Sequence, residues 1–322
     1  KLKNILSNES LENEISEEFI LYYNVPTYSS SKSKKLEKDK ILVPSHIIGF
    51  CIQKIIEYDL FIRLKQFTSK IIANIKYVTS KNINDRYFWL SNVFELKCVV
   101  ETIYNNEKEI REKDDIAIVS DVLKCFNDLV TEIYNMIWKS LSTHIKNETQ
   151  LKATKINDPK KDIVYYLKRS YKKLKFFYNE DAFNDLLLEE GVNLICTSWY
   201  SNYTIKRNSL MKKYETRIQD VERHLQINYI TVIQENSKKI YEWLIQNKIS
   251  MNSSCESLLQ SISKHNTNSL TDEKIMLCFT ELKINDICFE FEIPSYRKIK
   301  KLKVKNVPNS AYLTSTLFEL KV

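Results

Sequence analysis

Glycine is the residue that this chain most clearly lacks. Only Gly49 and Gly191 occur in 322 residues, whereas average usage of about 7% would give roughly twenty. The tight turns of β-hairpins and the loops that hold phosphates depend on glycine, because it adopts positive φ angles without strain. The chain also has only five prolines, so it has few of the residues that mark β-turns. The composition therefore favours an all-α fold.

The same shortage excludes several catalytic motifs. Two isolated glycines cannot form GxGxxG, a P-loop or the GxSxG turn of hydrolases. The four histidines lie far apart and form no HExxH, and the seven cysteines include no CxxC pair. Adjacent carboxylates occur at Asp114-Asp115 and Glu189-Glu190, but no acid–base arrangement can be placed around them. We therefore expect no enzyme activity, no cofactor and no metal site.

Long apolar runs and a secretory leader are also missing. No stretch reaches the roughly 18–20 apolar residues that are needed to cross a bilayer, and the N-terminus does not resemble a signal peptide. Five of the cysteines lie in apolar helical patterns, which predicts buried, reduced thiols; they are Cys51, Cys98, Cys125, Cys196 and Cys278. Together these features predict a cytoplasmic protein that does not insert into membranes.

The chain is basic, with a formal net charge of +8 at pH 7. Its basic residues gather at Lys32–Lys40, Lys168–Lys175, Lys206–Lys213 and Arg297–Lys305. Such clusters are compatible with binding to nucleic acid, to acidic lipid or to an acidic protein. More often, such clusters are simply solvated helix faces. Lysine predominates over arginine in them, which argues against base-specific recognition of nucleic acid.

Apolar periodicity predicts helices over most of the chain. The expected ranges are 11–24, 44–58, 60–80, 85–104, 116–146, 160–178, 182–206, 214–228, 236–248 and 271–283. The helix over 116–146 would be about 45 Å long, which suits a helix shared by two bundles. Residues 287–293 alternate apolar and polar residues, which predicts an extended segment. We therefore expect one helical lobe over 1–115, the long helix and a second lobe over 116–283, and an extended C-terminal segment over 284–322 that returns over the first lobe.

The predicted helix that begins near residue 85 carries three adjacent aromatic residues in the sequence DRYFWLSNVF. Two apolar stripes run from this sequence and together cover most of the helix circumference, which predicts burial on all sides. Ser91 and Asn92 must then bond to neighbouring backbone, because each buried group left unpaired would cost about 1–3 kcal/mol. Asn84 or Asp85 is expected to cap the helix.

The order of these segments resembles a known family. A helix that starts with proline (VPSHIIGFCIQKII) is followed by an amphipathic helix, by FWLSN and by a long helix that contains NDLVTEIYNMIWKSL. This order resembles the dilute domain, the cargo-binding globular tail of class V myosins. The most specific motif is FWLSN, which consists of Phe88, Trp89, Leu90, Ser91 and Asn92. The resemblance covers about residues 10–283, and Lys274 replaces a glutamine that is usual in the family.

The resemblance implies two packed helical lobes that share the long helix, and a function in docking rather than catalysis. Such a domain would bind a protein adaptor that links cargo to an actin-based motor, whose actin- and ATP-binding head lies in the rest of the myosin heavy chain. The resemblance also implies actin association through that head.

The residue usage, rich in isoleucine, lysine and asparagine, resembles that of budding-yeast proteins. Such yeasts have one class V myosin for vesicles and organelles and another that carries transcripts through an RNA-binding adaptor. Divergence from the organelle-type tail and the basic clusters favour the transcript carrier, with mRNA bound indirectly. The alternatives are an organelle or secretory-vesicle tail that binds Rab proteins or organelle receptors, and a helical protein that binds RNA directly through its basic clusters.

The segment CTSWYSNYTIKR, residues 196–207, is the candidate adaptor-binding site. Trp199 and Tyr203 are one helical turn apart and so share a helix face. Lys206 and Arg207 follow directly, so that two aromatic anchors would lie beside a cationic rim, as in many protein interfaces. The same pattern is compatible with both aromatic residues lying in the core. A second candidate surface, chosen by charge alone, consists of Arg297, Lys298, Lys300, Lys301 and Lys303.

Overall fold

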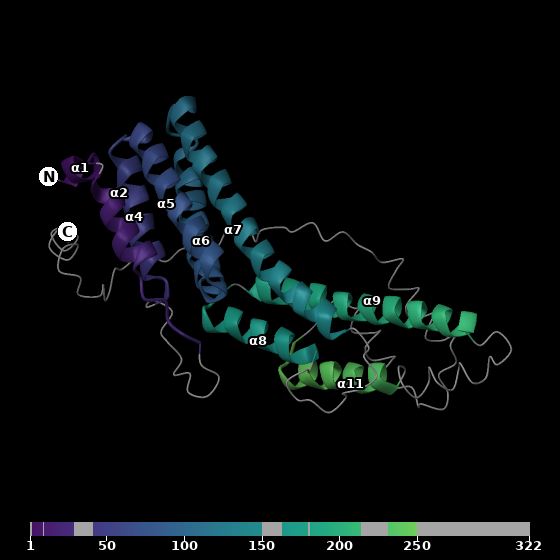
Figure 1. Ribbon diagram of the computed structural model, residues 1–322. Coiled ribbons are helices and arrows are strands. Elements are labelled where there is room, and N and C mark those ends of the chain that lie inside the picture. The colour runs from purple at the N-terminus through teal and green to yellow at the C-terminus, as the bar shows by residue number, and fades with distance from the viewer. Residues whose placement is uncertain are drawn as a thin grey trace. The chain divides into compact units, whose positions relative to one another are not determined.

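The computed structural model describes residues 2–8, 10–28, 41–149, 163–179, 181–213 and 231–249. Nearly all of these residues are helical, and none of them lies in a β-strand (Figure 1). The all-α prediction is therefore confirmed. The predicted helices at 214–228 and 271–283 and the predicted C-terminal segment at 284–322 lie outside the described residues.

The described helices follow the predicted order along the chain. They are α1 (Leu2–Leu6), α2 (Ser10–Ser16), the π-helix η1 (Glu17–Leu21), α4 (Val43–Glu57), α5 (Phe61–Lys81), α6 (Ile83–Glu107), α7 (Lys113–Glu148), α8 (Ile163–Phe176), α9 (Asp181–Lys213) and α11 (Thr231–Gln246). Most ends fall within a few residues of their predicted positions. The main differences are that α1 was not predicted, that the first predicted helix changes from α to π geometry at Glu17, and that α9 extends beyond its predicted end at residue 206 to Lys213.

The described residues form two compact units. Unit 1 holds the described residues up to Ile137 together with residues 173–179, and unit 2 holds those from Trp138 to Lys172 and from Asp181 onward. The division therefore falls inside α7 and inside α8. The sequence prediction put the boundary at residue 116, before the long helix, whereas the first part of that helix belongs to unit 1.

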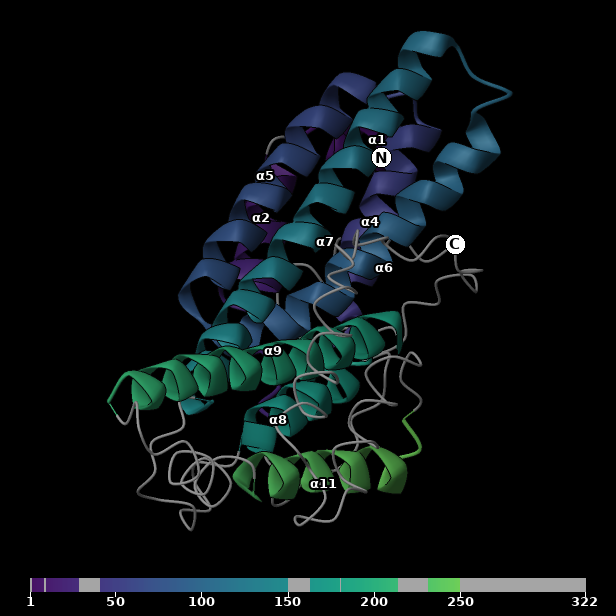
Figure 2. The same ribbon diagram turned by 90° about the vertical axis from the view of Figure 1, so that its right-hand side faces the viewer.

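Helix α6 is the centre of unit 1. Every residue from Tyr87 to Val100 is buried, and the helix packs against both α4 and α5 (Figures 1 and 2). Gly49 of α4 permits a close approach to α6, because a Cβ atom at this position would lie 3.3 Å from Val99 and 3.7 Å from Leu96. The predicted all-round burial of this helix is confirmed.

Both glycines lie inside helices, and the turns use other residues. Gly191 of α9 packs so closely on α8 that a Cβ atom would lie 2.6 Å from Leu167 Cδ1. In contrast, Asp59, Tyr178 and Lys248 adopt left-handed φ angles of 59°, 55° and 53° just after α4, α8 and α11. Three helices are therefore followed by a residue in the left-handed conformation that is usually occupied by glycine, although none of these three residues is glycine.

The helix starts follow the sequence in part. Pro44 lies in the first turn of α4, as predicted. The cap of α6 is not Asn84 or Asp85 but Asn82, whose side chain accepts a hydrogen bond of 3.0 Å from the backbone N–H of Asn84. Several short polar residues precede the apolar pattern, and each of them could cap the helix, so periodicity alone selected the wrong one.

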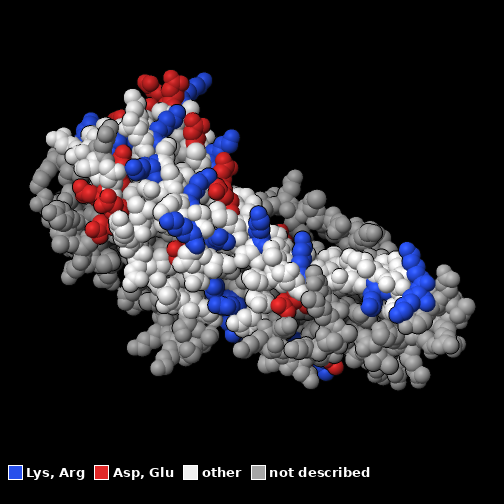
Figure 3. Space-filling model, in the orientation of Figure 1, with Lys and Arg blue, Asp and Glu red and all other residues white. Residues whose placement is uncertain are grey.

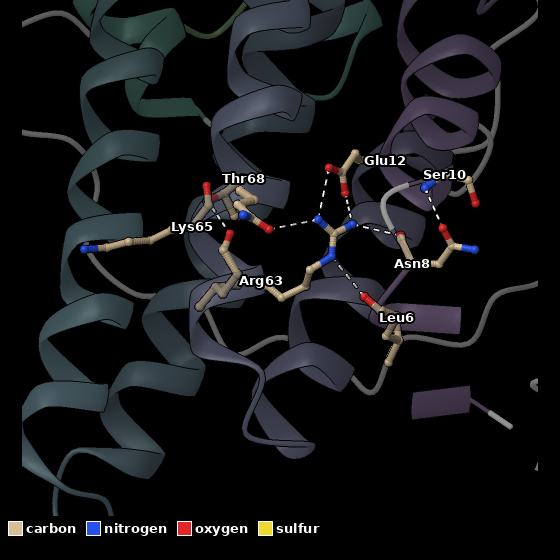
Figure 4. A network of polar contacts seen from close by, with 9 residues as sticks. Leu6, Asn8, Ser10, Glu12, Arg63, Lys65 and Thr68 are labelled. Carbon is tan, nitrogen blue, oxygen red and sulfur yellow. Dashed lines mark hydrogen bonds and ion pairs between the residues drawn. The ribbon is translucent and has the colours of Figure 1, made fainter. Parts of the chain in front are cut away.

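A buried arginine fastens the N-terminal helices of unit 1 to α5 (Figure 4). The guanidinium of Arg63 donates to both carboxylate oxygens of Glu12 and to the carbonyl oxygens of Leu6 and Asn8, the latter at 2.8 Å. Arg63 is 8% exposed and Glu12 is 9% exposed. A bidentate pair whose remaining donors are also bonded is the arrangement in which a buried ion pair is tolerated.

In unit 2, α8 lies between α9 and α11 (Figure 2). Leu167 of α8 faces the glycine at 191 of α9. The ring of Tyr171, one helical turn later, meets Trp243 of α11 edge-on, with ring centroids 5.6 Å apart. Among the described side chains of α8 in unit 2, Tyr165, Arg169 and Lys172 are exposed.

Candidate docking surfaces

The five residues of FWLSN are all buried, so the motif is part of the core rather than a surface for partners. Phe88, Trp89 and Leu90 are 0% exposed. The ring of Phe88 lies 5.5 Å from Tyr23 in a stacked arrangement and 5.9 Å from Phe177 in an edge-on one. The motif thereby joins the N-terminal segment and residues 173–179 to α6 within unit 1.

The two polar residues of the motif bond to backbone, as predicted. Ser91 Oγ donates to the carbonyl of Phe88 at 3.0 Å. Asn92 Nδ2 donates to the carbonyls of Ile41 and Phe88 at 3.1 Å, and its Oδ1 accepts a 3.1 Å bond from the backbone N–H of Ser45. Helix α4 has no side-chain cap at its own N-cap residue, so Asn92 supplies the missing acceptor from a neighbouring helix.

Trp199 does not lie where the candidate adaptor site requires it. Its side chain is 0% exposed, and its indole nitrogen has no hydrogen-bond partner among the described residues. The interpretation of Trp199 as a surface anchor is therefore wrong in this structure. Helical spacing places it on one side of α9, but only the non-local packing of unit 2 decides whether that side is covered.

The rest of the candidate site occupies the second half of α9. Tyr203 lies in the helix, although its side chain is outside the described residues. Lys206 and Arg207 are half-buried, and between them and Tyr203 lies Ile205, which is 66% exposed.

Exposed residues recur along this half of α9 at helical spacing. They are Ser201, Ile205, Asn208, Ser209 and Lys212. Residues three and four apart share a face of a helix, so these side chains form one exposed stripe. Basic side chains gather at the same end of α9, as Figure 3 shows. We call this stripe, with Ile205 as its apolar and Lys212 as its basic member, the α9 face. Lys206 and Arg207 are half-buried and lie off the stripe, on other sides of the helix.

Asn202 is a residue that the sequence analysis overlooked. Its side chain is half-buried, and Nδ2 donates to the carbonyl of Thr149, the residue after α7, at 2.9 Å. The signal was available, because WYSN at 199–202 repeats the W-x-S-N pattern of WLSN at 89–92. Asn202 and Asn92 both tie a helix to the backbone of another segment of their own unit.

The other sequence predictions have mixed outcomes. The second candidate surface, Arg297, Lys298, Lys300, Lys301 and Lys303, lies outside the described residues. Cys51 and Cys98 are buried as expected, but Cys125 is exposed, because it lies next to the buried stripe of α7 rather than in it.

Within the described ranges, no cluster of three or more potential metal ligands occurs, and no helix has the length and apolarity to cross a membrane.

Comparison with known proteins gives matches among solved structures. No family model and no curated protein matches the chain. Among solved structures, Myo2-GTD in complex with Inp2 is similar with a TM-score of 0.65 at 18% sequence identity, over 88% of this chain and 74% of that chain. The yeast myosin 5 cargo binding domain has a TM-score of 0.61 at 17% identity with the same coverage.

The Myo4p globular tail domain is similar over 84% of this chain and 91% of that chain, with a TM-score of 0.50 at 18% identity. The order of helices, the buried FWLSN motif and these similarities agree with the family that the sequence resembles. The chain therefore has the fold of the cargo-binding globular tail of class V myosins.

Proposed function

We propose that this chain is a non-enzymatic docking domain that connects an actin-based class V myosin motor to a protein adaptor. The observation that carries the proposal is the fold, because tails of this fold have been solved in complex with Inp2, with Smy1 and with Mmr1. The absence of catalytic motifs from the sequence agrees with docking as the main activity. The domain would act in the cytoplasm, next to actin, through the motor part of the heavy chain.

The α9 face is the adaptor-binding surface that we favour. Ile205 offers an apolar contact of 66% exposure, and the exposed Lys212 lies two turns later on the same stripe. Protein interfaces combine such an apolar centre with a polar rim, which the exposed Ser201, Asn208, Ser209 and Lys212 would supply here. Trp199 would contribute indirectly, by fixing α9 in the core of unit 2.

The cargo that we favour is an RNA–protein particle held through an RNA-binding adaptor. The net charge of +8 and the basic end of α9 suit a partner that is itself acidic or bound to nucleic acid. RNA would then be held mainly by the adaptor, with the domain supplying protein–protein contacts.

Affinity capture tests this proposal. The tagged 322-residue chain is incubated with a lysate of its source cells, and half of the sample is treated with ribonuclease before washing. We expect one or more proteins to remain bound after ribonuclease treatment, and RNA to be present only in the untreated half. Identification of the bound proteins distinguishes an RNA-binding adaptor from Rab proteins or organelle receptors.

Direct RNA binding is the result that would replace this proposal. Purified chain without any adaptor would then retain naked RNA, and log affinity would fall steeply with log salt concentration, because each neutralised phosphate releases a counterion. Capture of RNA without any protein partner would lead to the same conclusion.

A further inference from the structure

A second surface of unit 2 combines exposed aromatic rings, where the end of α7 meets α8. His144 of α7 stacks on Tyr166 of α8 with ring centroids 4.6 Å apart and an interplanar angle of 2°. Tyr165 meets Tyr166 edge-on at 5.4 Å. His144 is exposed, Tyr165 is 45% exposed and Tyr166 is half-buried. The three rings therefore form one continuous aromatic surface that is already ordered.

Basic side chains extend this aromatic surface along α8. Arg169 and Lys172 lie four and seven residues after Tyr165, which places all three on the same face of the helix, and all three are exposed. Lys168 instead lies over the ring of Trp243, with Nζ 5.5 Å from the ring centroid. Between Ile163 and Phe176 the helix contains no acidic residue, so no carboxylate on α8 itself neutralises this face.

We propose that this surface, which consists of His144, Tyr165, Tyr166, Arg169 and Lys172, binds an acidic peptide segment of the docked partner. This inference rests on the proposed docking function and adds the chemistry of the ligand. An arginine guanidinium pairs with a carboxylate through two parallel hydrogen bonds. Tyrosine and arginine are the residue types that concentrate binding energy at interfaces, and the stacked rings lose little conformational entropy when a partner binds.

The number of charges favours a peptide over nucleic acid. In the part of α8 that belongs to unit 2, the face carries two exposed cations, Arg169 and Lys172. Two cations match the carboxylates of a short acidic segment, whereas the affinity of a protein for a nucleic-acid backbone grows with the number of phosphates that its cations neutralise. The aromatic surface would take the apolar or aromatic side chains between those carboxylates.

The test uses a fluorescent synthetic peptide in which glutamate and aspartate alternate with leucine and tryptophan. A second peptide, with glutamine and asparagine in place of the acids, measures the contribution of charge, and a single-stranded oligouridylate measures binding of nucleic acid. The variants are Arg169→Glu with Lys172→Glu, and Tyr165→Ser. The matched controls are Lys70→Glu with Lys124→Glu, two exposed lysines of unit 1, and Tyr77→Ser, where the tyrosine is 51% exposed.

We expect the charge reversal on α8 to weaken binding of the acidic peptide about tenfold or more, and Tyr165→Ser to weaken it about fivefold, as at central interface positions. The control variants carry the same types of change, and their affinity for the acidic peptide should stay within about twofold of the wild-type affinity. Distant charges act on the peptide only through a field that salt screens. The neutral peptide should bind weakly to every variant. If the charge-reversed variant has a lower melting temperature than wild type, Arg169→Ala with Lys172→Ala is used in its place.

Three results would overturn the inference. Equal weakening by the unit 1 controls would mean that net charge alone attracts the peptide. Unchanged binding by both α8 variants would exclude this surface. Tighter binding of oligouridylate that depends on the same residues would identify a nucleic-acid surface instead. Each of these can occur while the wild-type chain still captures its protein partner, whereas failure to capture any protein would count against the proposed docking function itself.

Discussion

The two units contain the same four-residue pattern, W-x-S-N, in different surroundings. In unit 1 it reads WLSN on α6, and in unit 2 it reads WYSN on α9. Trp89 and Trp199 are both 0% exposed, and each asparagine donates to a backbone carbonyl of another segment of its own unit. The pattern thus supplies a buried ring and, three residues later, an amide that ties the helix to a neighbour.

The units differ in what surrounds the pattern. On α6 the burial continues on every side to Val100, and Ser91 is only 4% exposed. On α9 the equivalent serine, Ser201, is exposed, and the described side chains that follow it up to Lys213 are exposed or half-buried. A helix that mixes aromatic and polar residues is therefore buried or exposed according to the helices that pack around it. The tryptophan and the asparagine have the same structural role in both units.

Removal of either tryptophan ring is expected to have the largest effect on stability. Trp89→Ala and Trp199→Ala should each lower the free energy of unfolding by about 3–5 kcal/mol, because each leaves a large cavity in a packed interior. Urea denaturation followed by circular dichroism measures this loss. If Trp199→Ala kept wild-type stability and lost only partner binding, Trp199 would be a surface anchor after all.

Truncation of the two asparagines should lower the free energy of unfolding more in unit 1 than in unit 2. Asn92 makes three hydrogen bonds, one of which caps α4, so Asn92→Ala should cost about 2–3 kcal/mol through buried groups left unpaired. The side chain of Asn202 donates one bond and is half-buried, so Asn202→Ala should cost about 1 kcal/mol. The same urea titration compares them, and equal costs would show that α9 is as enclosed as α6.

Replacement of the two serines by alanine should also lower stability more in unit 1 than in unit 2, but with a smaller difference. Ser91 Oγ bonds to the carbonyl of Phe88 within its own helix, and alanine is the better helix former, so Ser91→Ala should change stability by less than about 1 kcal/mol. Ser201→Ala, at an exposed position, should stay within about 0.5 kcal/mol of wild type. Thermal melting curves of the two variants measure both changes. A larger loss for Ser201→Ala would contradict the exposed position of this serine.

Thiol reactivity tests burial in unit 1 without any substitution. Burial raises the pKa of the Cys51 thiol to about 12, and since the thiolate is the reactive form, Cys51 should resist alkylation in the native protein. Cys125 is exposed and should be alkylated first of the two. Peptide mapping by mass spectrometry after a short iodoacetamide pulse measures both sites, with denatured protein as the control. Equal labelling of the two thiols would contradict the enclosed position of α4 against α6.

Much of the fold could be predicted because it depends on local pattern. Apolar spacing predicted the described helices from α2 onward, but not the short α1. Burial of α6 followed from apolar residues on every side of its circumference. The backbone bonds of Ser91 and Asn92 followed from the cost of burying unpaired polar groups. Their actual partners could not be predicted, because Ile41 and Ser45 are brought to Asn92 only by the packing of α4 on α6.

The candidate site was harder to predict for the same physical reason. An aromatic residue on a helix with mixed faces is covered or exposed according to non-local neighbours, and periodicity does not identify those neighbours. Trp199 was therefore placed on the surface, while Ile205 was overlooked although it is more exposed. The left-handed residues after α4, α8 and α11 were also unexpected, because tertiary packing can impose that conformation on Asp59, Tyr178 and Lys248 without glycine.

The central claim is that the domain docks a protein partner through the α9 face, and titration of the captured partner tests it most directly. The affinity of that partner is measured for wild type, for Ile205→Glu with Lys212→Glu on the α9 face, and for the control Ile62→Glu with Lys70→Glu, an exposed isoleucine and an exposed lysine of unit 1. We predict that the α9 variant binds at least about tenfold more weakly at an unchanged melting temperature, while the control binds like wild type. Equal affinity for all three proteins would contradict the claim.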